Sequence, residues 1–185
     1  MAAKSVAIVT GASQGIGRAT ALRLARDFSV IVLVARDKDK LENTASDVVS
    51  LGAEAMVYVL DLRQPQSAKT IIERTLERYG RIDALLNIAG AVPQIDLFQM
   101  TDAQWDDGMA LKLNGARRLT IAAWNALKAS QGSVVLISGS AAFDPSPNMR
   151  QSQQSMQPLT RSLRHSQSKE SKTVYRSTAS HLERS

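Results

Sequence analysis

Residues Thr10–Gly17 read Thr-Gly-Ala-Ser-Gln-Gly-Ile-Gly, directly after the β-branched run Val6–Thr10 and before a segment with helical spacing of its apolar residues. Glycine at position 11 lets a strand turn sharply, and glycines at 15 and 17 let backbone approach a pyrophosphate and a helix pack on a strand. The helix that begins here would offer free N–H groups and a partial positive charge to an anion. We therefore predict a nucleotide-binding turn; the alternative is a plain glycine-rich link between strand and helix.

Outward from this turn, apolar runs and amphipathic segments alternate along the first 148 residues. Val30–Ala35 is unbroken apolar, which is typical of a strand buried on both faces. An alternation of strands and helices with short links predicts βαβ units and a parallel sheet. We predict an α/β fold, a Rossmann-like, doubly wound parallel sheet that is incomplete at about five strands. The expected strands are 6–10, 30–35, 54–60, 82–87 and 133–138, and the expected helices are 15–26, 39–51, 67–79 and 102–130, the last with room for a break.

The net charge of +6 and the isoelectric point of about 9.9 come from one end of the chain. Residues 1–148 hold 16 Lys and Arg against 15 Asp and Glu, whereas residues 149–185 hold 7 against 2. The second segment is rich in Ser and Gln and poor in apolar residues, so it cannot bury enough surface to offset its ordering entropy. We predict a dinucleotide-binding domain over 1–148 and a disordered basic tail over 149–185. Nucleic-acid binding is the alternative for the tail, but Tyr175 is its one aromatic residue and it has no basic helical stripe, so we predict no nucleic-acid partner.

Composition excludes several classes of function. The chain has no cysteine, which rules out disulfides, zinc–thiolate sites, iron–sulfur clusters and a cysteine nucleophile. No apolar run reaches the roughly 18 residues of a membrane span, and the N-terminus lacks a secretory layout. We expect a cytoplasmic protein with no membrane partner and no metal site.

Three motifs in chain order resemble the short-chain dehydrogenase/reductase family. The spacing Gly-x-x-x-Gly-x-Gly is the first, and Asn87-Ile88-Ala89-Gly90 resembles the family's Asn-Asn-Ala-Gly, with Ile in place of the second Asn. Asp61-Leu62 stands where an acidic residue after the third strand contacts adenine. The resemblance covers residues 5 to about 148. It implies a dinucleotide cofactor held by Gly11, Ser13, Gln14, Gly15, Ile16, Gly17, Arg36, Asp61, Leu62, Asn87, Ala89 and Gly90.

The same resemblance implies two catalytic residues. Asn114, in Lys-Leu-Asn-Gly, matches the Asn of the family's catalytic tetrad, and Ser140, in Ile-Ser-Gly-Ser-Ala-Ala-Phe, resembles its catalytic Ser. Ser138 competes with Ser140 for that position, and the following Ala-Ala favours Ser140. Each motif also has a purely structural reading: Asn87 and Gly90 as the end of a strand, Asp61 as a turn former, Asn114 as a capping or exposed residue, and Ser140 as part of a loop.

The end of the second expected strand indicates which dinucleotide is bound. NAD-binding proteins place a carboxylate there for the ribose hydroxyls, but here Ala35 holds that position and Arg36 follows. A guanidinium suits a 2′-phosphate through charge-assisted, bidentate hydrogen bonds. Asp37 would favour NAD if the register were shifted by two, and Gln14 stands where many NADP-using relatives carry a basic residue. We predict NADP as the cofactor, with NAD as the less favoured alternative.

One catalytic signature of the family is missing. Relatives transfer a hydride between the nicotinamide and a carbonyl or alcohol carbon, using a Tyr as acid/base four residues before a Lys. Tyr58, Tyr79 and Tyr175 are followed four residues later by Leu, Asp and Ala. By resemblance the chain is an NADP(H)-dependent oxidoreductase for a small carbonyl or alcohol, although this absence argues against turnover. The alternative is an inactive remnant that at most binds dinucleotide.

The tail suggests an origin for this absence. When the codons of residues 150–162 and 175–183 are read one base out of frame, they can encode sequences that resemble the family's next helix and strand. We therefore hypothesise a truncated or frameshifted family member whose tail is translated in another reading frame. An incomplete sheet would leave its fifth strand as an edge with apolar surface exposed. We therefore expect poor stability or abnormal association rather than the family's homo-oligomer.

Overall fold

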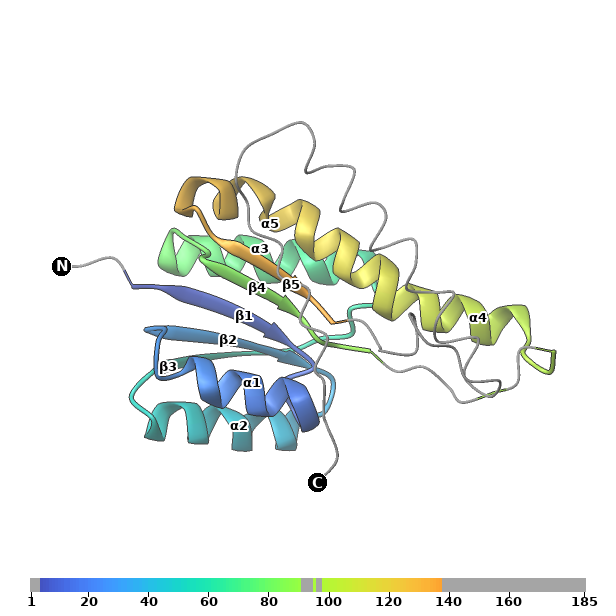
Figure 1. Cartoon of the computed structure of the whole chain (residues 1–185), viewed down its shortest axis with the longest axis horizontal. Helices are drawn as coiled ribbons and strands as arrows, with labels where there is room; N and C mark the ends of the chain where they lie inside the picture. Colours follow the sequence, from blue (N-terminus) through green and yellow to red (C-terminus); the bar gives the residue numbers. More distant parts are fainter. Residues whose placement is uncertain (1–3, 91–94, 96–97, 138–185) are drawn as a thin grey trace, which may run out of the picture.

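A five-stranded parallel sheet forms the centre of the computed structural model, which describes residues 4–90, 95 and 98–137 (Figure 1). The strand order is β3-β2-β1-β4-β5, so the order reverses between β1 and β4. All four neighbouring pairs are parallel, with Val6 of β1 opposite Val30 of β2 and Ala7 of β1 opposite Ala84 of β4. The strands are β1 (Val6–Thr10), β2 (Val30–Ala35), β3 (Glu54–Val59), β4 (Ala84–Asn87) and β5 (Ser133–Leu136).

Helices cover both faces of the sheet. Figure 1 shows α1 and α2 on one face and α3 and α5 on the other, while α4 extends beyond the carboxyl ends of the strands. A π-helical segment, η1, joins α4 to α5 without a loop. The helical elements are α1 (Gly15–Leu24), α2 (Lys38–Ser50), α3 (Pro65–Tyr79), α4 (Asp102–Met109), η1 (Ala110–Gly115) and α5 (Ala116–Ser130).

Apart from Thr10 at the end of β1, the central strands β1 and β2 are apolar at every position because both of their faces are buried. In β1, Val6 and Ile8 face the core beneath α3 and α5, whereas Ala7 and Val9 face the core beneath α1 and α2. The two cores are completed by one apolar stripe from each covering helix, such as Leu119 of α5. Burying a Val, Leu or Ile side chain contributes about 1.5–3 kcal/mol, so this sandwich of layers holds the sheet together.

The predicted fold class is confirmed, with small differences at the ends of elements. The helix expected at 15–26 ends at Leu24, and the strand expected at 82–87 begins at Ala84. Gly80 ends α3 in the left-handed conformation with a φ of 71°, which glycine adopts without strain. The break expected within 102–130 is the π-helical η1. Residues 138–185, which include the expected end of the fifth strand and the predicted tail, lie outside the described residues.

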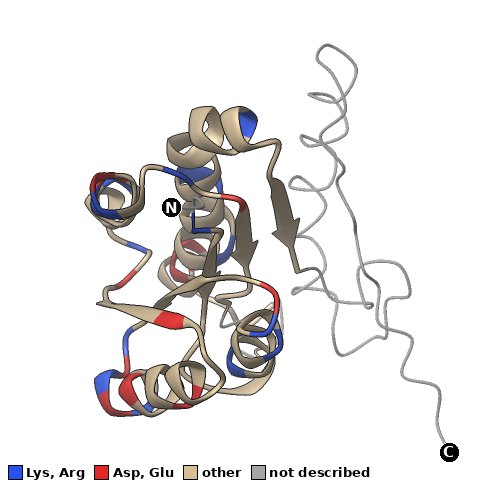
Figure 2. Cartoon of the chain, turned by 90° about the vertical axis from the view of Figure 1, so that its left-hand side faces the viewer, with Lys and Arg blue, Asp and Glu red and all other residues tan. Residues whose placement is uncertain are grey.

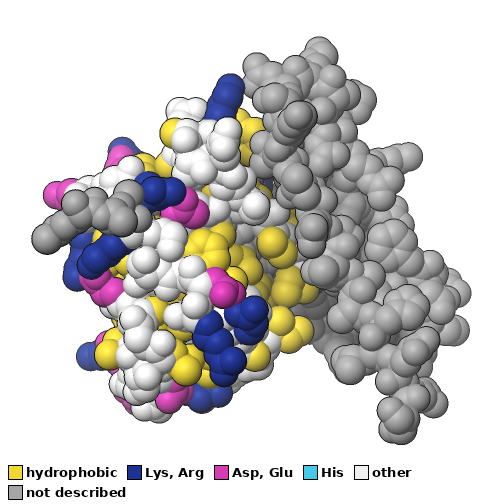
Figure 3. Space-filling model, turned by 60° about the vertical axis from the view of Figure 1, so that its left-hand side comes forward, with side chains coloured by type: hydrophobic (Ala, Val, Ile, Leu, Met, Phe, Trp, Pro, Cys, Tyr) yellow, Lys and Arg dark blue, Asp and Glu magenta, His cyan; other side chains and the backbone are white. Residues whose placement is uncertain are grey.

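Charges of both signs are interspersed on the described surface, as expected for a nearly neutral domain. Figure 2 shows Lys, Arg, Asp and Glu on the outer faces of the helices and in the links, and Figure 3 shows the two signs mixed on one face. Within the described ranges, no helix has both the length and the apolar character needed to cross a membrane.

Candidate functional site

The carboxyl ends of the strands meet around a cavity of about 810 Å³. This volume lies within the range of about 300–1,000 Å³ that is usual for small-molecule sites, and the reversal of strand order places such a crevice here. Every strand contributes the residues that follow it. The cavity is lined by Gly11, Ser13, Gln14, Gly15, Ile16, Gly17, Val34, Ala35, Arg36, Asp37, Lys40, Leu60, Asp61, Leu62, Ile88, Ala89, Gly90, Leu111 and Ile137.

The turn between β1 and α1 requires glycine at two of its positions. Gly11 has a φ of +68°, and a Cβ there would lie 3.0 Å from the Cα of Ala89. A Cβ on Gly17 would lie 2.1 Å from the carbonyl oxygen of Gly11. No side chain caps α1, and no acidic residue stands in its first turn, so the helix presents its N-terminal N–H groups to the cavity. This arrangement suits a bound phosphate.

A buried hydroxyl joins this turn to the loop after β4. Thr10, the last residue of β1, is 1% exposed, and its Oγ1 donates a hydrogen bond to the carbonyl oxygen of Leu86 at 3.2 Å. The same oxygen accepts hydrogen bonds from the backbone N–H groups of Ile88 at 2.9 Å and Ala89 at 3.0 Å. Thr10 therefore fixes the wall formed by residues 88–90. Thr10 was not among the predicted site residues, although it is the one polar residue in an apolar strand.

Asn87 lies behind this wall rather than in it. Its side chain is buried, and its Nδ2 donates to the Oγ1 of Thr120 on α5 over 3.4 Å. Its Oδ1 is buried and has no hydrogen-bond partner among the described residues. Eleven of the twelve predicted cofactor-binding residues thus line the cavity, and Asn87 instead links β4 to α5.

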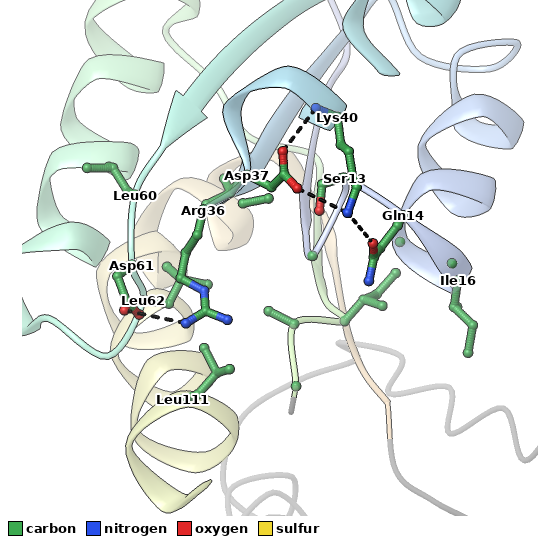
Figure 4. Close-up of a pocket in the computed structure, with 18 of the residues that line it drawn as sticks. Ser13, Gln14, Ile16, Arg36, Asp37, Lys40, Leu60, Asp61, Leu62 and Leu111 are labelled. Carbon is green, nitrogen blue, oxygen red and sulfur yellow. Dashed lines mark hydrogen bonds and ion pairs between the residues drawn. The ribbon is translucent and has the colours of Figure 1, made fainter. Parts of the chain in front are cut away.

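At the rim of the cavity, the residues that follow β2 include two cations, Arg36 and Lys40, and one carboxylate, Asp37, which is hydrogen-bonded to Lys40. Asp37 caps α2: it accepts a hydrogen bond from the backbone N–H of Lys40 at 3.1 Å, and it pairs with the Lys40 ammonium at 3.1 Å. These two hydrogen bonds from Lys40 lower the pKa of the Asp37 carboxyl. Lys40 Nζ also donates to Oε1 of Gln14 at 3.2 Å, joining the N-cap residue of α1 to the first turn of α2 (Figure 4). Lys40 was not among the predicted residues; a basic residue in the first turn of the second helix was its only signal.

Asp61, which follows β3, lies between two guanidinium groups. Arg63 donates to it from both its backbone N–H and its Nε, and Nη1 of Arg36 lies 4.0 Å from Oδ2 of Asp61. Figure 4 shows the side chains of Arg36 and Asp61 pointing toward one another across the rim. Partial burial raises the pKa of the Asp61 carboxyl, but the hydrogen bonds from Arg63 outweigh it, and the pKa is below its usual value. The carboxylate is therefore ionised at neutral pH.

Of the two predicted catalytic residues, Asn114 alone lies within the described part of the chain. Asn114 lies in η1 and does not line the cavity, whereas Leu111 of the same segment does. Ser140 lies outside the described residues. Gly115 seats η1 against the loop after β3, because a Cβ there would lie 3.0 Å from the carbonyl oxygen of Leu62. Single-turn π segments recur at functional sites, so the place of Asn114 is notable while its role stays a prediction.

The two described tyrosines lie away from the cavity. The Oη of Tyr58 lies 3.6 Å from the Sδ of Met56, and burial raises the pKa of this phenol. Tyr79 donates to Glu54 at 2.5 Å, at the amino-terminal end of the sheet. Burial and this hydrogen bond raise the pKa of Tyr79 well above its usual range. Neither phenol is placed to exchange a proton with a molecule in the cavity.

The sequence is similar to those of known short-chain dehydrogenases and reductases. The family model described as short chain dehydrogenase matches residues 5–175, which extends past the predicted domain boundary at 148. An uncharacterized oxidoreductase of Listeria monocytogenes is 36% identical over 110 residues, 60% of this chain and 44% of that protein. A 3-oxoacyl-(acyl-carrier-protein) reductase of Thermotoga maritima is 30% identical over 134 residues, 72% of this chain and 54% of that protein. The chain thus spans about half the length of the curated relatives that it matches.

The solved structures that resemble this chain include one in complex with NADP and one bound to NAD⁺. A metagenomic short-chain oxidoreductase in complex with NADP has a TM-score of 0.78 and 32% identity, with 88% of this chain and 78% of that one covered. A xylitol dehydrogenase bound to NAD⁺ has a TM-score of 0.81 and 26% identity, with 88% of this chain and 63% of that one covered.

Proposed function

Since this chain belongs to the short chain dehydrogenase family, we propose that it binds a nicotinamide dinucleotide in the cavity at the carboxyl end of its sheet, and NADP(H) in preference to NAD(H). One observation carries the preference. The rim after β2 presents the Arg36 guanidinium and the Lys40 ammonium, while Asp37, the nearest carboxylate there, is held by Lys40 as the cap of α2.

The residues present fit such a cofactor. Within the glycine turn at 11–17, backbone packs too closely for a Cβ at Gly11 or Gly17, whereas a Cβ at Gly15 would meet none of the described atoms within 4 Å, and the N-terminus of α1 opens onto the cavity. A pyrophosphate would lie there, against backbone N–H groups. Asp61 and Leu62 stand where the adenine would lie, and Ala89 and Gly90 form the opposite wall. When bound, the nicotinamide ring would donate or accept a hydride.

The charges at the rim support NADP over NAD. A carboxylate must be free to accept hydrogen bonds from both ribose hydroxyls if NAD is to be preferred. Asp37 already accepts two hydrogen bonds from Lys40. The Arg36 side chain is 55% exposed and free to turn toward a 2′-phosphate. Arginine binds phosphate through two parallel hydrogen bonds, and this recognition has no counterpart on the NAD ribose.

The reaction that we propose for the family scaffold is hydride transfer between NADP(H) and a small carbonyl or alcohol. Two relatives are named as an oxidoreductase and a 3-oxoacyl-(acyl-carrier-protein) reductase, and both match over about half of their own length. None of the three tyrosines of this chain has a lysine four residues later. We therefore expect this chain to bind the cofactor with little or no turnover, and a titration of NADPH fluorescence with and without a panel of carbonyl compounds tests that expectation.

The dissociation constants of NADP⁺ and NAD⁺, measured by calorimetry, test the preference. Replacing Arg36 with alanine removes a charge-assisted contact of about 1.5–3 kcal/mol, so we expect NADP⁺ to bind roughly tenfold to 100-fold more weakly. Binding of NAD⁺ should change far less. Arg26→Ala is the matched control, because Arg26 is an exposed arginine beyond the far end of α1. Equal losses for both dinucleotides would reject the preference, and a wild-type chain that binds neither would reject the whole proposal.

A further inference from the structure

We propose that Arg63, which does not line the cavity, sets the preference for NADP by taking up the charge of Asp61 and so leaving Arg36 free for the 2′-phosphate. This inference rests on the proposed function, because it explains a preference for NADP. It makes Arg63 a positioning residue, one that acts on the cofactor through Arg36 and Asp61. Two guanidinium groups compete for one carboxylate, and their geometry decides which of them holds it.

The carboxylate of Asp61 is bound by Arg63 and only approached by Arg36. Arg63 Nε donates to Oδ1 at 3.2 Å and to Oδ2 at 3.0 Å, and its backbone N–H donates to Oδ1 at 3.0 Å. Arg36 Nη1 lies 4.0 Å from Oδ2, beyond hydrogen-bond distance. Asp61 is therefore hydrogen-bonded to Arg63, while Arg36 retains donors for another acceptor.

Arg63 is itself held by two further elements of the fold. Its Nη1 pairs with the carboxylate of Asp107 on α4, and Nη1 of Arg118 on α5 donates to its carbonyl oxygen at 3.2 Å. The Arg63 side chain is 25% exposed, against 55% for Arg36. An arginine held at both its guanidinium and its backbone loses little conformational freedom when it binds Asp61, which favours it over the more exposed Arg36.

Loss of Arg63 would change what a 2′-phosphate meets at the rim. Asp61 would remain ionised and partly buried without its partner, and the closest described cation would be Arg36. A carboxylate pulls in a guanidinium that is about 4 Å away, and it repels a phosphate of the same sign. Arg36 would then be diverted from the phosphate, and the NAD ribose, which carries no charge, would be little affected.

The test compares the ratio of the dissociation constants for NADP⁺ and NAD⁺ in four proteins: the wild type, Arg63→Gln, Asp61→Asn and the double variant. We expect Arg63→Gln to shift the ratio about tenfold toward NAD⁺, the size of one weakened charge contact at a partly exposed site. Removing Asp61 as well should restore the wild-type ratio. Asp61→Asn alone can weaken the binding of both dinucleotides, because Asp61 stands on the adenine side of the cavity. The readout is therefore the ratio of the two dissociation constants rather than either constant.

Arg81→Gln is the matched control. Arg81 holds Asp83 with the same pair of contacts from Nε, at 3.2 and 3.0 Å. These residues directly precede β4, so they lie at the opposite end of the strands from the cavity. The Arg81 variant loses a similar ion pair and should keep the wild-type ratio. A shift in this control as large as that of Arg63→Gln would overturn the inference, because any lost surface pair would then produce it.

The remaining outcomes separate the inference from the function on which it rests. If Arg36→Ala abolishes the preference but Arg63→Gln leaves the ratio unchanged, the inference fails and the proposed function stands. If the double variant keeps the shift of Arg63→Gln, Arg63 does not act through Asp61 and the inference is wrong. If Arg63→Gln does not fold, the comparison is made between Asp61→Asn and the double variant. These two must give the same ratio of dissociation constants, and a difference between them would overturn the inference. A wild-type chain without preference rejects the proposed function itself.

Discussion

Replacing Gly17 with alanine adds one methyl group at a point where the backbone of the turn between β1 and α1 already lies. The added Cβ would be 2.1 Å from the carbonyl oxygen of Gly11 and 2.5 Å from its carbonyl carbon. Ordinary contact begins at 3.4 Å, so the turn and the helix must separate by more than 1 Å. Both clashing atoms are backbone, and the N–H of Gly11 is bound to the carbonyl of Val34 at 2.8 Å, so the strain cannot be relieved by turning a side chain.

Two quantities should change together in Gly17→Ala. Overpacking of this kind costs about 1–3 kcal/mol of unfolding free energy. The displaced helix would also move its N-terminal N–H groups away from the pyrophosphate, and each hydrogen bond to a charged group is worth about 1.5–3 kcal/mol. Losing one of them weakens dinucleotide binding roughly tenfold to 100-fold. NADP⁺ and NAD⁺ should lose affinity equally, because both carry the pyrophosphate.

Chemical denaturation and calorimetric titration measure these two quantities, and Gly108→Ala is the control. Gly108 is also a helical glycine, in α4, but a Cβ there would meet none of the described atoms within 4 Å. Alanine is the better helix former by about 0.5–1 kcal/mol, so this variant should be more stable and should bind dinucleotide normally. Unchanged affinity in Gly17→Ala, or an equal loss of stability in both variants, would refute the steric argument.

Two further predictions concern polar groups that organise the two ends of the sheet. Thr10→Val should lower the unfolding free energy by at least about 2 kcal/mol, because two backbone N–H groups after β4 lose their acceptor. Thr10→Ser keeps the hydroxyl and should retain most of the wild-type unfolding free energy. A decrease of less than about 0.5 kcal/mol for Thr10→Val, measured by denaturant unfolding, would contradict this prediction. Glu54 accepts hydrogen bonds from Lys4, Tyr79 and Arg78, and those from Lys4 and Tyr79 are the main cause that lowers its pKa from 4.5 to about 2. A lowered pKa stabilises the fold above the unfolded value of 4.5, and this contribution disappears as the pH falls through about 2, so the gap in melting temperature between wild type and Glu54→Gln should narrow across that window; a constant gap would contradict the assignment.

The sheet and the glycine turn were predictable because local pattern and tertiary position agree there. β1 and β2 are buried on both faces, so every residue from Val6 to Val9 and from Val30 to Val34 must be apolar, and the sequence shows this directly. The turn at Gly11 leaves few alternatives to glycine, because its φ is positive and Ala89 packs against it. Eleven of the twelve residues predicted from the family motifs accordingly line the cavity.

The side-chain partners at the rim were not predictable from the same pattern. Arg63 and Lys40 contact residues that are distant in the chain, Asp107 and Gln14, and these pairs form only once several strand ends have converged. The π-helical form of η1 was equally hidden. Helical periodicity runs through 102–130, and the wider turn arises where Gly115 packs on the loop after β3.

Helix α4 buries none of its residues, so its helical form depends on the Thr101 capping box, on continuity with η1 and on the pair between Arg63 and Asp107. Elements with few buried apolar contacts open in sub-global steps at a lower free energy than the core does. Asp107, which pairs with the Arg63 guanidinium, therefore lies in a helix that can unfold locally while the core stays folded. Cofactor preference, if set by Arg63, would respond to temperature and solvent conditions that leave the β-sheet core intact.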